Sequence, residues 1–139
     1  MRIGILASLL LAASCGPDEN APILTSLRCV DQRHCQDPLN PFLLHLQVNF
    51  SDADGDFGNP ASTINVRLDD TLQETKPAAQ WFAAAGLDTR ATSGTLKFDL
   101  EVRFQNIEDG QRFVVAVDAK DAAGHESNQP ELLMELRLE

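Results

Sequence analysis

The residues best suited to chemistry form one short run, Ser51-Asp52-Ala53-Asp54-Gly55-Asp56. Three carboxylates alternate in it, and Gly55 allows the chain to turn tightly between them. Calcium takes about six to eight oxygen ligands, and carboxylates this close together on a bending loop supply several of them. The run fails as an EF-hand loop, because Phe57 and Thr63 stand where that loop needs Gly and Glu. It predicts either a calcium-binding loop or a polar turn whose charges water screens.

Patterns typical of enzymes are missing from the sequence. It has no Gly-x-Ser-x-Gly elbow, no phosphate-binding glycine loop and no His-Glu-x-x-His zinc helix. The three histidines, His34, His45 and His125, are scattered, and we expect them to face solvent. The formal net charge of −10 repels phosphates and anionic lipid heads, which argues against nucleic acid as a partner. The sequence therefore predicts a protein that is not an enzyme.

The N-terminal segment has the composition of an export signal. Arg2 precedes an apolar run from Ile3 to Ala13, which is too short for a permanent membrane helix of about 20 residues. The sequence Leu11-Ala12-Ala13-Ser14-Cys15 resembles the lipobox of bacterial lipoproteins. That resemblance implies a signal peptide over residues 1–14, a diacylglycerol on Cys15 and a polar tether over residues 15–22. An ordinary secretory signal is the alternative.

Gly16 follows the cysteine that carries the lipid in this interpretation. In the enterobacterial sorting rule of that family, Asp at this position retains a lipoprotein at the inner membrane. The resemblance therefore implies a place in the bacterial cell envelope, at the outer membrane in preference to the inner one.

The cysteine count agrees with export. The chain has three cysteines, so lipidation of Cys15 leaves Cys29 and Cys35 as a pair. In an oxidising compartment such a pair forms a disulfide, and the short segment between them closes a small loop easily. A metal site made by the two thiolates and His34 is the alternative.

Alternating apolar residues dominate the rest of the chain and predict strands with one dry face and one wet face. The expected strands cover residues 23–30, 42–50, 64–68, 95–104, 113–119 and 132–138, with turn residues between them. Because no long helical pattern intervenes, the sequence predicts two antiparallel sheets packed face to face.

One helix is expected, over Lys76 to Ala85, with Thr75 as its cap and Gly86 after its end. It contains Trp81 and Phe82. Either these aromatics pack over the edge of the sandwich, or they form a platform that binds a carbohydrate or a peptide. Residues 69–75 are expected to be a long loop.

A segment near the C-terminus resembles a known family. Residues 108–128 contain an Asp-Gly turn, the aromatic Phe113, an alternating strand, Asp118, and a turn around Gly124. They look like the last two strands of bacterial immunoglobulin-like domains, which include fibronectin type III, cadherin-like and PKD-like relatives. The resemblance implies an immunoglobulin-like two-sheet sandwich over residues 23–139. Acidic loops of the kind found at residues 52–56 occur in cadherin-like relatives.

The order of strands in such a domain has a consequence for the acidic loop. In that order, the loop after the second strand and the loop after the penultimate strand lie at the same end of the sandwich. Asp118 and Asp121 would then join Asp52, Asp54 and Asp56, and five crowded carboxylates need a cation or water to screen them. These five aspartates are our candidate calcium ligands.

Together these patterns predict a monomeric, lipid-anchored envelope protein that binds a protein partner as an accessory or adhesive module, with calcium stabilising one end. The alternative is a carbohydrate- or peptide-binding lipoprotein that uses Trp81 and Phe82. A third class is an inhibitor that inserts the loop over residues 69–75 into an enzyme.

Overall fold

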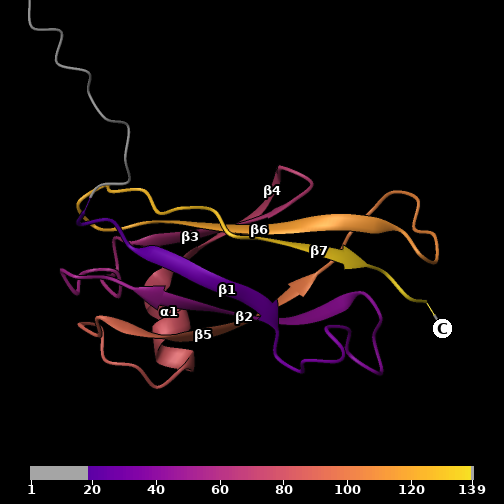
Figure 1. The fold of residues 1–139 in the computed structure, drawn as a ribbon, viewed down its shortest axis with the longest axis horizontal. Helices are drawn as coiled ribbons and strands as arrows, with labels where there is room; N and C mark the ends of the chain where they lie inside the picture. The colour runs from indigo at the N-terminus through magenta and orange to yellow at the C-terminus, as the bar shows by residue number, and fades with distance from the viewer. Residues whose placement is uncertain (1–18, 139) are drawn as a thin grey trace, which may run out of the picture.

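The structure is a computed structural model, and it describes residues 19–138 (Figure 1). In this part of the chain seven strands and one short helix follow one another. They are β1 Ile23–Cys29, β2 Leu43–Ser51, β3 Thr63–Leu68, β4 Thr71–Pro77, α1 Ala78–Ala84, β5 Ser93–Glu101, β6 Arg112–Lys120 and β7 Glu131–Glu135. Strands β1-β2-β5 form one antiparallel sheet and β4-β3-β6-β7 the other. The expected all-β, immunoglobulin-like sandwich is confirmed.

Strand β2 shows why these residues form strands. Every second residue from Leu44 to Phe50 is buried, and the residues between them lie on the outer face. Opposite it, β5 places Leu96, Phe98 and Leu100 against the same core. This alternation fixes the register between β2 and β5, because a slip by one residue would move the apolar side chains from the core to the solvent-exposed face.

Helix α1 and the acidic loop close one side of the core with aromatic rings. Phe82 lies 4.8 Å from Phe50 and 5.5 Å from Phe57, measured between ring centroids. Trp81 stacks on Phe98 at 4.5 Å. Such ring pairs stabilise a core by about 0.5–1.5 kcal/mol each beyond the apolar area that they bury. The helix is therefore held by its aromatic face, which explains how seven residues stay helical.

Strand β4 corrects the expected loop over residues 69–75. Asp69 and Asp70 alone make the turn after β3, with φ of 47° and 66°, and Thr71 begins β4. Two residues in the left-handed region form the tight turn that suits a β-hairpin. Both faces of β4 are largely exposed, so it has no buried alternation by which it could be recognised.

The helix is shorter than expected and begins differently. Pro77 occupies the cap position, and no side chain caps the helix. Thr75 lies in β4 instead, where its hydroxyl donates to Asn65 Oδ1 at 2.7 Å. Gly86 does follow the helix end, with φ of 67°. Two strands end earlier than expected, β5 at Glu101 and β7 at Glu135.

The strands run between two ends of the sandwich (Figure 1). We call one end the acidic pole; it carries the loops over residues 52–62, 85–92 and 121–130. The other end carries residues 30–42, which we call the disulfide loop, together with residues 102–111 and 136–138. Ile23 pairs with Ser51, so the chain enters β1 at the acidic pole. No helix within residues 19–138 has the length and apolar character needed to cross a membrane.

Candidate functional site

The acidic loop begins with a carboxylate that organises it. Asp52 is 1% exposed, and its Oδ2 accepts the backbone N–H groups of Asp56 and Phe57, each at 2.8 Å. Gly55 has φ of 66°, and a Cβ there would stand 2.8 Å from the carbonyl oxygen of Arg90. The Asp-x-Asp-Gly-Asp pattern therefore encodes a tight turn pressed against residues 88–92.

Two carboxylate oxygens in this loop are left without a partner. Asp52 Oδ1 and Asp56 Oδ1 are both buried, and neither has a hydrogen-bond partner among the described residues. Burial, followed by the negative charges of Asp121 and Asp52, raises the pKa of Asp56 above its ordinary value. A buried acceptor without a donor costs free energy, and the negative charges of the two carboxylates repel each other. This pair of aspartates therefore destabilises the loop.

The other three candidate ligands differ in where they lie. Asp121 comes to the acidic pole as expected, but its two oxygens accept the backbone N–H and face the Nδ1 of His125, each at 2.8 Å. Asp118 lies instead on the outer face of the four-stranded sheet, where Oδ2 is 2.9 Å from Arg67 Nε. Asp54 is exposed at the tip of its loop. The structure thus brings together Asp52, Asp56 and Asp121, and not Asp118.

The donor set at the acidic pole suits a calcium ion only in part. Asp52 and Asp56 offer two oxygens with no other partner, whereas calcium takes about six to eight. Within residues 19–138, no group of three or more His, Cys, Asp or Glu side chains is arranged so that it could hold a metal ion. Any calcium held here would need backbone carbonyls and water for most of its ligands.

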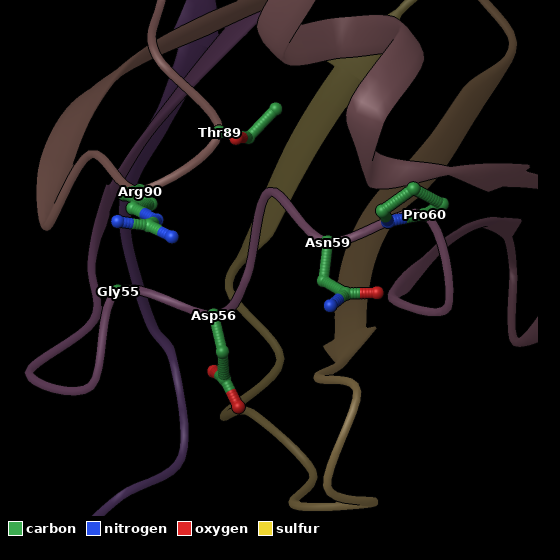
Figure 2. Close-up of a pocket in the computed structure, with 6 residues that line it drawn as sticks. All are labelled: Gly55, Asp56, Asn59, Pro60, Thr89 and Arg90. Atoms are coloured by element: carbon green, nitrogen blue, oxygen red, sulfur yellow. The ribbon is translucent and has the colours of Figure 1, made fainter.

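A shallow hollow of about 260 Å³ opens beside the acidic loop (Figure 2). It is lined by Gly55, Asp56, Asn59, Pro60, Thr89 and Arg90. In Figure 2 the carboxylate of Asp56 points away from Arg90. The hollow therefore does not join the guanidinium and the carboxylate into one polar site.

Trp81 and Phe82 do not form a binding platform in this structure. Trp81 is 5% exposed and Phe82 is fully buried, both within the core described above. The expectation that they pack against the sandwich is confirmed, and the alternative of an exposed aromatic site is wrong. The physical reason is that the helix has no other apolar face with which to attach itself.

The disulfide between Cys29 and Cys35 is present, with the two Cα atoms 4.7 Å apart. The disulfide loop that follows β1 is further tied down by Gln36, whose side chain donates to the carbonyls of Pro41 and Arg137 at 2.8 and 2.7 Å. Its tip carries Leu39, which is 94% exposed. The expected metal alternative with His34 does not apply, because both sulfur atoms are bonded to each other.

His45 is the site residue that the sequence did not reveal. It lies on the outer face as expected, with a partly exposed side chain, but its Nδ1 also lies 2.6 Å from Asp99 Oδ1 and its Nε2 lies 3.0 Å from Asp37 Oδ2. The strand pattern places both His45 and Asp99 on wet faces, but it does not show that their strands pair. Asp37 could not be found from the sequence, because only the folded disulfide loop brings it there.

The signal peptide over residues 1–14, Cys15 and residues 16–18 of the tether lie outside the described residues. The segment that resembles an immunoglobulin-like domain, residues 108–128, contains β6 and the turn after it; the last strand, β7, begins only at Glu131. The resemblance therefore covers the penultimate strand and not the last two.

Comparisons with known proteins add the following. No protein-family model and no curated protein sequence matches the chain. Among solved structures it is similar to the PKD domain of an M14-like peptidase from Thermoplasmatales archaeon SCGC AB-540-F20. The identity is 16% and the TM-score is 0.46, over 85% of this chain and 94% of that domain. At this identity the likeness concerns the fold alone.

Proposed function

We propose that this protein is a non-catalytic, lipid-anchored module of the bacterial cell envelope, which acts as an accessory or adhesive domain by binding a protein partner. Three features support the proposal. The N-terminal segment resembles a lipoprotein signal that ends at Cys15. The Cys29–Cys35 disulfide is of a kind that persists in oxidising compartments outside the cytoplasm. The aromatic side chains of the sandwich pack in or against its own core, which suits a structural or docking module.

The observation that carries the proposal is the orientation that the sandwich would take relative to an anchor at Cys15. Because Ile23 pairs with Ser51, an anchor at Cys15 would attach the protein through its acidic pole. The disulfide loop would then face away from the membrane, with Leu39 nearly free of contacts at its tip. A loop that is already ordered loses little entropy on binding, so an exposed leucine on it suits an apolar pocket of a protein partner.

The lipid anchor is tested by the mass of the mature chain. We expect cleavage before Cys15 and a mass that includes a diacylglycerol, with the protein in the membrane fraction and, in a diderm host, in the outer membrane. Cys15→Ser is the control and should leave an uncleaved precursor or a soluble chain. A wild-type chain released without lipid would show that the signal is an ordinary secretory one.

The partner surface is tested by photo-crosslinking in intact envelopes. A crosslinker at position 39 should give one defined adduct, and excess unlabelled wild-type chain should compete it away while the Leu39→Asp variant should not. The matched control is a crosslinker at position 72, because Leu72 is also exposed but lies on β4. Equal adducts from both positions would contradict a partner at the disulfide loop. Light scattering of the purified protein should give the mass of a monomer.

Calcium enters the proposal as a stabiliser of the acidic pole through Asp52 and Asp56. A ligand at about 100 times its Kd adds about 2.7 kcal/mol to stability, which is several degrees of Tm for a domain of this size. We expect the Tm in millimolar calcium to exceed that in EDTA, and the difference to vanish in Asp56→Asn. Asp118→Asn is the control and should keep the calcium effect. Equal melting of the wild type in both buffers would remove calcium from the proposal.

A further inference from the structure

His45 adds side-chain contacts between the three-stranded sheet and the disulfide loop, which backbone hydrogen bonds from the His45 N–H to the Cys35 carbonyl and from the Asp37 N–H to the Leu43 carbonyl already join. It lies on the outer face of β2 directly opposite Asp99 of β5. Its other ring nitrogen meets Asp37, which belongs to the disulfide loop. One imidazole therefore spans the three-stranded sheet and the loop that carries Leu39.

Both contacts can be hydrogen bonds only when the ring is doubly protonated. An ionised carboxylate accepts and cannot donate, and neutral imidazole has a single N–H. With one proton, His45 can donate to Asp99 or to Asp37, and the remaining nitrogen would face an acceptor. The hydrogen bonds to Asp99 and then to Asp37 accordingly raise the pKa of His45, and the bond to His45 lowers the pKa of Asp37.

Asp37 passes this contact on to the tip of the loop. Its Oδ1 accepts the backbone N–H groups of Leu39 at 2.8 Å and Asn40 at 3.1 Å, while its Oδ2 meets His45. Its own N–H donates to the carbonyl of Leu43 at 2.8 Å. One carboxylate thus shapes the turn around Leu39 and ties that turn to the sheet.

The outer face of the three-stranded sheet carries other charged groups. They have partners of their own or, like Lys97 and Glu101, carry opposite charges whose effects on His45 oppose each other. Glu101 and Lys97 flank Asp99 on β5, and Glu101 pairs with Arg103 at 2.9 Å. Arg28 on β1 donates to the carbonyl of Ser26 at 2.8 Å. Asp37 and Asp99 are therefore the charges that His45 meets directly.

We propose that His45 is a proton-operated latch, whose imidazolium fixes the Asp37 side chain, and with it the turn around Leu39, to the three-stranded sheet. When the ring loses a proton it keeps the shorter bond to Asp99 and gives up Asp37, so the turn around Leu39 loosens. The direction follows from linkage: a histidine whose pKa is higher in the folded state stabilises fully below its unfolded value, which is 6.5. That contribution is lost as the pH rises through the folded value.

Asp99→Asn separates a latch from a static contact. In this variant neutral His45 can donate from Nε2 to Asp37 and accept at Nδ1 from the new amide, so the Asp37 side chain and the turn around Leu39 should stay held at any pH. The experiment uses NMR on the full chain to follow the His45 ring and the amide protons of Leu39 and Asn40. Amide exchange is expressed as protection relative to the intrinsic rate, because that rate itself rises with pH.

In the wild type we expect protection of the Leu39 and Asn40 amides to fall about tenfold as His45 deprotonates, the order expected from one lost hydrogen bond to a charged group. In Asp99→Asn, His45 should titrate at lower pH and the protection should not fall. Glu101→Gln removes a charge from the same strand and face, and it should behave like the wild type. The latch is refuted if wild type and Asp99→Asn share one pH profile, or if Glu101→Gln changes it as much as Asp99→Asn does.

Discussion

At the acidic pole Asp52 stabilises the loop, whereas Asp56 destabilises it. Asp52 is needed where it is, because its Oδ2 caps the turn through two backbone N–H groups. Asp56 is placed by that turn beside a second carboxylate, and each of the two has an oxygen without a donor. The aspartates were visible in the sequence, and so was their gathering with Asp121. Their unequal roles were not visible, since these depend on which oxygen each N–H meets.

Asp56→Asn should therefore stabilise the protein at neutral pH when no divalent cation is present. The substitution removes a half-buried negative charge and supplies an amide that can donate to Asp52. We expect a gain of about 1 kcal/mol, small because solvent screens part of the repulsion. The measurement is urea unfolding in EDTA. Asp54→Asn, at an exposed position, should change little, and a loss of stability in Asp56→Asn would contradict the unpaired arrangement.

At the scale of elements, the strands with one buried face were predictable and those without one were not. The alternation along β2 and β5 predicts that both strands exist, although not that they pair with each other, whereas β4 lies at a sheet edge and lacks that alternation. The ends of elements were the least predictable: Val102 is still buried although β5 ends at Glu101. Burial continues past the end of the strand, as does one backbone hydrogen bond from the Val102 N–H to the Phe42 carbonyl at 2.8 Å, so a pattern of apolar residues overestimates the length of a strand.

Glycines around α1 give a test of how this element is packed. A Cβ on Gly58 would lie 2.4 Å from the carbonyl oxygen of Thr89 and 2.8 Å from a ring carbon of Phe82. Gly58→Ala must therefore displace backbone, and we expect it to cost about 3 kcal/mol or more. Gly86→Ala meets no atom within 4 Å and is strained only by its positive φ, so about 1 kcal/mol is expected. Thermal unfolding of both variants checks this, and equal losses would contradict the close packing at Gly58.

For the whole molecule, the sequence predicted two sheets, one disulfide and an N-terminal anchor, but not which parts share an end. The contact between His45 and Asp37 depends on how the disulfide loop folds back, and no periodicity records that. The disulfide between Cys29 and Cys35 stabilises the disulfide loop. It limits the conformational freedom of the unfolded state as well as ordering the folded one.

Replacing both Cys29 and Cys35 by Ala should lower stability by about 2 kcal/mol, the value expected for a loop this short. A fall in Tm of roughly 5–10 °C follows for a domain of this size. The measurement is thermal unfolding with and without reductant. Reductant should lower the Tm of the wild type by a similar amount and leave the double variant unchanged. A wild type that is insensitive to full reduction would show that the loop is held by its hydrogen bonds alone.

The entry of the chain at one pole and the end of β7 at the other have a mechanical consequence (Figure 1). A membrane attachment on the Ile23 side and a load on the Glu135 side would pull along the strands rather than across them. Under such shear, the bonds between β1 and β2, and those between β6 and β7, share the force and must break together. Tension applied across the β3–β4 hairpin would instead open its bonds one at a time. A sandwich anchored and loaded at these two ends would therefore resist tension through shear between its strands.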